Sequence, residues 1–484
     1  MKMPFSPDRR QFLKSASGGF AMTAFAGMCG NLQAQPADPL ASQPAHFSPA
    51  ADRVIFIYAT GGVSHVDTFD YKPQLEKDHG KPIVASRWLN KSGEFTRYLI
   101  KPRWNFKQYG KNGIWVSDLF PHLGEVIDDV CVLNAMHCDS DGHDKGTLAA
   151  HTGSAQFSRP SVGSWVSYGL GTENQNLPSF MVLAPAAPYA GAQTWGSCFL
   201  PGCHQGTHVI PGKDPIANVT PRVASRQQQQ MELGLLRRLN RSHQDSRAAD
   251  LAINARIRSF ETAFGMQQAA PEAFDLSGET QKTLQMYGME RVDTTGFGWQ
   301  CLMARRLAER GVRFIELIDV GSNNNWDSHG NMEDHARLAK NIDKPIAGLI
   351  RDLKQRGMLE RTLLVWTSEF GRTPFNTNAN HAGREHHNFC FTSWMAGGGV
   401  KGGMVYGRSD EYGIMAAENS AHTHDLHATI LHQVGLDHER LTYRHAGRDF
   451  RLTDVRGEVL HDIVLSKNSA ELQPQYKARL KKSK

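Results

Sequence analysis

The feature that most constrains the fold is a series of apolar, β-branched segments separated by polar and helical ones. Six segments have the composition of buried strands: 53–62 (RVIFIYATGG), 126–136, 177–185, 312–320, 361–371 and 389–399. Continuous apolar runs of this kind are typical of parallel strands covered on both faces. The alternation therefore predicts an α/β fold with a mostly parallel central sheet and helices on both faces.

Two stretches between these strands are predicted to be helical. Residues 334–357 carry apolar side chains at three-to-four spacing and end at Gly357, a typical helix stop. Residues 222–289 are rich in Gln, Arg, Leu and Ala and poor in strand formers. This second stretch interrupts the alternation, and we expect it to form a helical insertion or cap.

Carboxylates and imidazoles follow several of the predicted strands. They occur in GGVSHVDTFD (61–70), HCDSDGHDKG (137–146), NNNWDSHGN (323–331) and SEFGRTP (368–374), and a later loop carries HAGREHHNF (381–389). Ligands of open α/β sheets bind at the carboxyl ends of the strands. A single Asp there is more often a helix cap than a ligand, and a single His is usually a hydrogen-bonded polar residue. Several converging carboxylates, however, would repel one another unless a cation compensates them.

The mixture of donors indicates which cation to expect. Imidazole and carboxylate ligands together suit zinc, manganese or iron better than calcium, which prefers all-oxygen cages. The sequence predicts a site for a divalent metal, with zinc as the first choice. Asp327 and His329 stand two residues apart in NNNWDSHGN, so a bent loop can direct both side chains to one ion.

The N-terminus has the pattern of an export signal. Arg9 and Arg10 precede Phe12, Leu13 and Lys14 and a mildly apolar, Gly-rich stretch. This pattern predicts a twin-arginine signal peptide over residues 1–34, with the twin-arginine translocase as a transient partner and a periplasmic or secreted destination. The apolar stretch is too short to span a bilayer stably, and no stable membrane span is expected elsewhere.

The rest of the chain divides by composition. Residues 35–52 are a Pro/Ala-rich linker, 53–466 the α/β domain and 467–484 a basic tail. The formal charge of +6 is modest for 484 residues, and no basic stripe is interleaved with aromatics, so nucleic acid is not expected as a partner. Among the cysteines, Cys198 and Cys203 flank a turn and form the pair that the sequence favours for a disulfide, the alternative being buried free thiols.

Several segments resemble one exported bacterial family, domain-of-unknown-function family 1501. They are GGVSHVDTFDYKP, HTGSAQFSRPSVGSWVSYGLG, ARRLAERGVRFIEL, NWDSHGN, LVWTSEFGRTP, GREHH and DLHATILHQVGL. That family is similar in fold to the alkaline phosphatase and sulfatase superfamily. The resemblance implies a hydrolase that acts on a small anionic ester of phosphate or sulfate. The alternative is a periplasmic binding or scaffold protein that keeps the fold without the chemistry.

The resemblance also implies roles for particular residues. The metal ligands that it assigns are Asp67, Asp327, His329, Glu369 and His386. Phe370 stands where a metal-binding His is common, so one ligand of a two-metal site is missing. No C-x-P-x-R motif is present, and formylglycine chemistry is therefore not expected.

The resemblance places the nucleophile of the superfamily near His143, and Thr147 lies one turn further along. His143 could serve as general acid or base, as a metal ligand or as a helix cap. Arg372 or Arg384 could hold an oxyanion, or instead form a salt bridge that orients Glu369 or Glu385.

Overall fold

The computed structural model describes residues 38–465, except 89–90, 218, 220–224, 246–250 and 291–292. The predicted export signal and the basic tail lie outside the described residues. Within the described part of the chain, no helix is both long and apolar enough to cross a membrane.

The centre of the molecule is a nine-stranded sheet in the order β15-β6-β14-β10-β1-β9-β7-β8, with β18 also paired to β6. Its strands are β1 (Arg53–Tyr58), β6 (Val130–His137), β7 (Phe180–Leu183), β8 (Thr207–Val209), β9 (Phe314–Ile318), β10 (Thr362–Thr367), β14 (Phe391–Ala396), β15 (Met404–Tyr406) and β18 (Ala421–His422). All six predicted strand segments contribute to it. The pairings are parallel except those of β14 with β10 and β6, so β14 alone in this sheet runs against the others.

The direction of β14 positions the functional site. The parallel strands β1, β6, β9 and β10 end at one edge of the sheet. Because β14 is antiparallel to them, it begins at that edge, and the loop before it meets the loops after the other strands. Residues 381–390 are thereby placed beside the connections that follow β1, β6, β9 and β10.

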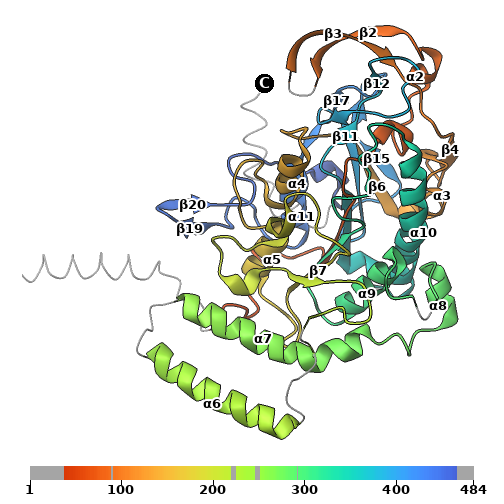
Figure 1. Cartoon of the computed structure of the whole chain (residues 1–484). Coiled ribbons are helices and arrows are strands. Elements are labelled where there is room, and N and C mark those ends of the chain that lie inside the picture. Colours follow the sequence, from red (N-terminus) through yellow and green to blue (C-terminus); the bar gives the residue numbers. More distant parts are fainter. Residues whose placement is uncertain are drawn as a thin grey trace, which may run out of the picture.

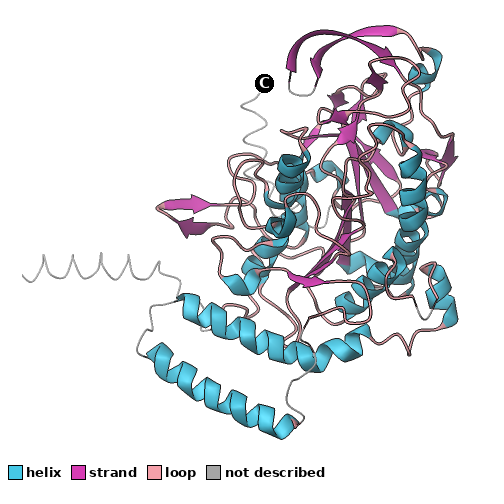
Figure 2. Cartoon of the chain, in the orientation of Figure 1, coloured by secondary structure: helices cyan, strands magenta, loops and turns pink. Residues whose placement is uncertain are grey.

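Helices cover both faces of the sheet, as the sequence predicted (Figures 1 and 2). The helices are α2 (Pro73–Lys77), α3 (Pro121–Gly124), α4 (His143–Thr152), α5 (Val162–Leu170), α6 (Arg226–Asp245), α7 (Leu251–Phe274), α8 (Gln281–Met286), α9 (Phe297–Glu309), α10 (Glu333–Gln355) and α11 (Thr423–Gln433). Figure 1 shows α9 and α10 on one side of the sheet and α4, α5 and α11 on the other. Each side has its own cluster of buried apolar residues, because alternate side chains of every strand point to opposite faces.

The two predicted helical stretches are helical. The first forms α10, which ends just before Gly357, where a φ of 66° requires a conformation that glycine adopts freely. The second contains α6, α7 and α8, of which α6 lies outermost, against α7 (Figure 1). That this stretch is an insertion or cap of the α/β domain stays a prediction.

Short strands outside the main sheet were not predicted. They form small sheets from β2 (Pro82–Trp88), β3 (Lys91–Leu99) and β12 (Phe375–Asn376), from β4 (Phe106–Tyr109) and β5 (Ile114–Ser117), from β11 (Gly371–Arg372) and β13 (His386–His387), from β16 (Arg408–Ser409) and β17 (Ala416–Glu418), and from β19 (Tyr443–His445) and β20 (Arg448–Phe450). The pairing of β11 with β13 matters for function, because it fixes His386 opposite Arg372.

The predicted disulfide is absent from the structure, since Cys198 and Cys203 are both free thiols. Cys198 Sγ instead donates to the carbonyl oxygen of Ser158, at 3.2 Å. A turn between two cysteines brings them near each other in space. A disulfide bond also needs Cβ atoms that point toward each other, which the sequence does not specify.

Candidate metal centre

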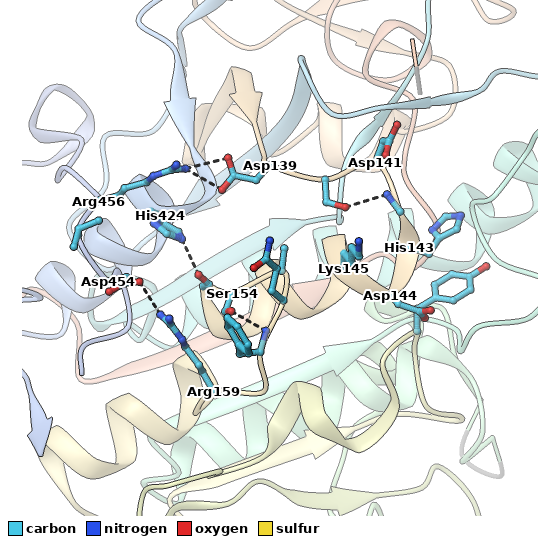
Figure 3. Close-up of a pocket in the computed structure, with 18 residues that line it drawn as sticks. Asp139, Asp141, His143, Asp144, Lys145, Ser154, Arg159, His424, Asp454 and Arg456 are labelled. Carbon is cyan, nitrogen blue, oxygen red and sulfur yellow. Dashed lines mark hydrogen bonds and ion pairs between the residues drawn. The ribbon is translucent and has the colours of Figure 1, made fainter. Parts of the chain in front are cut away.

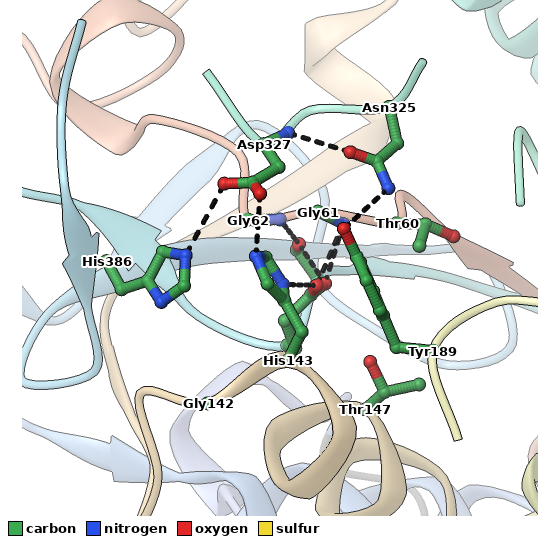
Figure 4. Close-up of polar contacts among 12 residues, drawn as sticks. Thr60, Gly61, Gly62, Gly142, His143, Thr147, Tyr189, Asn325, Asp327 and His386 are labelled. Atoms are coloured by element: carbon green, nitrogen blue, oxygen red, sulfur yellow. Dashed lines mark hydrogen bonds and ion pairs between the residues drawn. The ribbon is translucent and has the colours of Figure 1, made fainter. Parts of the chain in front are cut away.

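Four side chains from three loops converge at the edge of the sheet where the parallel strands end. They are His143 at the start of α4, Asp327 and His329 after β9, and His386 just before β14, and their donor atoms all lie within 4.8 Å of one another. Figure 4 shows Asp327 between His143 and His386. Three of the predicted metal ligands, Asp327, His329 and His386, are therefore together, and His143 joins them.

The distances within this group are short. Asp327 Oδ1 lies 3.0 Å from His329 Nε2 and 3.4 Å from His386 Nε2, while Oδ2 lies 3.2 Å from His143 Nε2. His329 Nε2 and His386 Nε2 are 2.9 Å apart. We refer to these four residues as the His₃Asp cluster.

Each histidine of the cluster is held through its other ring nitrogen. His329 Nδ1 lies 2.7 Å from a Glu385 carboxylate oxygen, His143 Nδ1 lies 2.8 Å from Glu369 Oε1, and His386 Nδ1 lies 2.6 Å from the carbonyl oxygen of Asp141. A carbonyl or ionised carboxylate can only accept, so each Nδ1 carries the hydrogen. Each ring is thereby oriented with its Nε2 toward the centre, as in metal-binding histidines, and a metal bound there would replace any hydrogen on Nε2.

This arrangement fits a cation. His329 Nε2 and His386 Nε2, 2.9 Å apart, can share one hydrogen, and a cation between them would take the place of that hydrogen. Zinc–ligand bonds of about 2.0–2.2 Å place tetrahedral donors roughly 3.3–3.6 Å apart, only a few tenths of an ångström beyond the distances found. The buried Nε2 of His143 faces the same carboxylate, at 3.2 Å from Asp327 Oδ2. The residues present therefore match a four-ligand site for zinc, manganese or iron.

The electrostatics of the cluster favour positive charge. Hydrogen bonds to Asp327 and Glu385 raise the pKa of His329 to about 9. Burial opposes ionisation of Asp327, but hydrogen bonds from the three histidines and the charge of Arg372 outweigh it and hold its pKa far below the usual range. Burial lowers the pKa of His386, so this ring is neutral near pH 7.

Arg372 holds Asp327 in place. Its Nη2 lies 2.6 Å from Asp327 Oδ1, and its other nitrogens donate to the carbonyl oxygens of Gly62 and Arg384, at 2.9 and 3.2 Å. The guanidinium is fully buried. It therefore connects the loops after β1, β9 and β10, and does not present a free fork to a substrate.

The loop that carries Asp327 is fixed by its neighbours in NNNWDSHGN. The indole of Trp326 is fully buried and donates to Asp319 Oδ2 at 2.5 Å. Asn325 Oδ1 accepts from the backbone amide of Asp327 at 3.0 Å, and its amide nitrogen donates to the hydroxyl of Tyr189 at 3.2 Å (Figure 4). The polar residues of this loop are needed to turn Asp327 toward the cluster.

Glu369 lies beside the cluster with its oxygens already occupied. It accepts from His143 Nδ1, from the Gly61 amide at 2.8 and 3.0 Å, and from the hydroxyls of Tyr58 and Ser368, both at 2.9 Å. These contacts surround both oxygens of Glu369 inside the protein. In this structure Glu369 orients His143.

The other predicted site residues are also accounted for. The Thr147 hydroxyl is buried and lies 3.0 Å from the Tyr58 hydroxyl, behind His143 and away from the cluster. Asp67 is not brought into the cluster. It forms a buried ion pair with Arg384 at 2.6 Å and accepts from Ser64 Oγ at 2.5 Å. Arg384, a second candidate for oxyanion binding, is thereby occupied as well.

A second group of potential ligands, His65, Asp70 and Cys390, is also compact and buried. Lys72 already compensates Asp70 at 2.9 Å, and Ser409 donates to the same carboxylate at 2.5 Å. Burial raises the pKa of the Cys390 thiol well above its ordinary value, so it stays protonated. This group is therefore less suited to a cation than the His₃Asp cluster, which offers three imidazole nitrogens beside its carboxylate.

Close backbone packing makes the cluster sensitive to one glycine. A Cβ on Gly383 would lie 1.8 Å from the carbonyl oxygen of His329, so Gly383→Ala must push the 327–329 loop away from the 384–387 loop. We expect a loss of stability of about 1–3 kcal/mol and weaker metal binding. Urea unfolding and a zinc titration would measure both. Gly330→Ala is the matched control, because nothing lies within 4 Å of its added Cβ. Equal behaviour of the two variants would contradict the prediction.

Comparison with known proteins defines the class. The chain matches the model "Protein of unknown function (DUF1501)" over residues 51–464 and belongs to that family. No curated protein matches the sequence.

Three solved structures are similar to this chain. A sulfatase from Pseudoalteromonas sp. is 12% identical, covers 81% of this chain and 69% of its own, and has a TM-score of 0.32. The alkaline phosphatase of the Antarctic bacterium TAB5 is 11% identical, covers 74% and 94%, and has a TM-score of 0.29. The lipoteichoic acid synthase LtaP from Listeria monocytogenes is 7% identical, covers 86% and 79%, and has a TM-score of 0.30.

Some residues around the cluster were not found from the sequence. Tyr58 lies within an otherwise apolar strand, where it resembles a core residue. Tyr189 lies in the loop after β7, in a stretch that matches no recognisable motif. The ring of Tyr189 stacks on His143 at a centroid distance of 4.2 Å and an interplanar angle of 14°. Glu385 was noted only as a salt-bridge partner, although its place in GREHH, next to His386, was a usable signal.

Proposed function

We propose that the protein is a hydrolase with a single divalent cation held by His143, Asp327, His329 and His386, and that it acts on an ester of phosphate or sulfate. The observation that carries the proposal is the set of three Nε2 atoms directed at one carboxylate by three separate Nδ1 hydrogen bonds. Zinc is the first choice of ion, and manganese or iron also suit these donors. The ester class comes from the sequence resemblance.

The ion would supply one kind of chemistry: it polarises a substrate oxygen and lowers the pKa of a water that it binds. The protein supplies the rest. The first turn of α4 begins at His143, so the positive end of the helix dipole adjoins the cluster and favours an anionic group there. Glu369, Glu385 and Arg372 keep the cluster in place.

Tyr189 is the candidate proton donor in this proposal. Its hydroxyl accepts from Asn325 at 3.2 Å and retains its own hydrogen. Burial raises the pKa of Tyr189, so the phenol is protonated at neutral pH. Lying against His143, it can donate to the oxygen of a leaving group.

The test combines metal analysis with hydrolysis. Protein purified from the periplasm should contain about one equivalent of metal per chain by mass spectrometry. It should hydrolyse p-nitrophenyl phosphate or sulfate, lose this activity on chelation and regain it with the ion. Tyr189→Phe should lower kcat by about 100-fold and leave metal content unchanged.

A binding or scaffold protein is the second candidate, and one observation favours it. The hydroxyl of Thr147 is buried and bonded to Tyr58, so it is not placed to act as a nucleophile. A protein that holds its metal but hydrolyses neither ester would support this candidate. A protein without metal would contradict the proposed hydrolase.

A further inference from the structure

One residue of the His₃Asp cluster, His143, lines one end of a cleft of about 1120 Å³. Asp141 and His143 lie at this end, and Ser154, Arg159, Asp454 and Arg456 lie at the other (Figure 3). Tyr189 also lines the cleft and stacks on His143. Pockets for small ligands are usually about 300–1,000 Å³. The cleft therefore has room for a substrate that extends well beyond the one group beside the cluster.

The charges along the cleft are paired with one another. Arg456 bonds both oxygens of Asp139, at 2.9 and 3.0 Å, and Arg159 bonds Asp454 at 3.1 Å (Figure 3). The lining carboxylates Asp139, Asp141, Asp144 and Asp454 outnumber the cations Lys145, Arg159 and Arg456. Because carboxylates are in excess, the part of the cleft far from the cluster does not attract a polyanion.

These ion pairs still offer hydrogen bonds. Each paired carboxylate keeps lone pairs and each guanidinium keeps N–H groups, so donors and acceptors alternate along the wall. Hydroxyl groups, which donate and accept at once, match this wall better than a hydrocarbon chain or a row of anions.

An exposed aromatic ring stands in the same cleft. The side chain of Phe157 is 64% exposed, and its loop is fixed because its backbone amide donates to Ser154 Oγ at 3.1 Å. A fixed, solvated ring gives an apolar face on which a flat ligand can stack. The C–H face of a pyranose ring is such a ligand, and its hydroxyls point to the sides.

We infer that the far part of the cleft binds an uncharged saccharide, so that the substrate is a sugar ester whose single anionic group reaches the His₃Asp cluster. This inference rests on the proposed function, since it names what the ester is attached to. Saccharide binding itself involves Phe157 and the paired Asp and Arg residues, and needs neither the metal nor hydrolysis.

The test measures binding of ester-free ligands by isothermal titration calorimetry to the full exported protein, with and without metal. The probes are uncharged cello-, manno-, xylo- and agaro-hexaoses, with a heparin hexasaccharide as the polyanion. At least one uncharged hexaose should bind, equally well after metal removal, and more tightly than heparin. Phe157→Ala should weaken its Kd about tenfold, and Phe157→Trp should restore it.

Phe260→Ala is the matched control, because Phe260 is 66% exposed but lies on α7, outside the cleft. The inference is overturned if no uncharged hexaose binds, if heparin binds more tightly, or if Phe157→Ala behaves like Phe260→Ala. Saccharide binding without ester hydrolysis would overturn the proposed hydrolase and leave this inference standing, so the two failures are distinguishable.

Discussion

Replacing Asp327 by asparagine should lower the affinity for the metal by about 100-fold or more, because loss of an outer-sphere partner alone costs about 10–100-fold. The variant keeps the shape of the side chain but removes the single carboxylate of the His₃Asp cluster. At a metal concentration about 100 times the wild-type Kd, the metal-dependent gain in stability should fall from about 2.7 to about 0.4 kcal/mol. Thermal melts with and without metal, together with metal analysis, measure this change.

Asp334→Asn is the control for this experiment, because Asp334 is an exposed carboxylate in the following helix whose contact with Arg337 is on the surface. If Asp327 only pairs with the buried Arg372, asparagine should lower the stability with and without metal alike and leave metal binding unchanged. Unchanged metal stoichiometry and an unchanged metal-dependent shift in melting temperature would then argue against a ligand at position 327.

Replacing Asp67 by asparagine should lower the free energy of unfolding by about 3 kcal/mol and leave the metal content unchanged. The change removes the partner of Arg384, whose guanidinium is 1% exposed and would remain charged and buried. Carbonyl oxygens of Thr373 and Lys101, each 3.0 Å from a guanidinium nitrogen, keep the cost near the lower end of the range for broken buried pairs. Urea unfolding and metal analysis of the same sample separate the two effects.

The matched control is Asp52→Asn, which breaks the more exposed ion pair between Asp52 and Arg361. Exposed pairs contribute about 0–1 kcal/mol, so this variant should be close to wild type. A fall in metal content in Asp67→Asn with unchanged stability would instead identify Asp67 as a ligand, as the family resemblance implied.

Much of the site was predicted because its residues follow strands. Asp327 and His329 lie in the loop after β9 and His143 opens the helix after β6, so a prediction of parallel strands already brings them to one edge. His386 was predicted only through the resemblance. Its position depends on β14 running against its neighbours, and an apolar strand segment carries no sign of its direction.

The sequence could not show which residues the polar side chains at the site pair with. Asp67 and Arg384 are separated by 317 residues, and Glu369 and Tyr58 by 311. Both carboxylates follow strands and both suit a metal by residue type. Arg384 compensates the charge of Asp67 inside the protein. Glu369 is surrounded by five hydrogen-bond contacts, two with the Gly61 amide and one each with His143, Tyr58 and Ser368.

The sequence by itself determined the strands, the helices between them and the edge of the sheet where polar side chains gather, because apolar periodicity and helix stop signals are local. The tertiary structure alone decided which of those polar side chains remain available to a cation. Hydrogen bonds and ion pairs depend on distances in space, and the folded chain sets those distances only when β14, α4 and the loop of Asp327 are all in place.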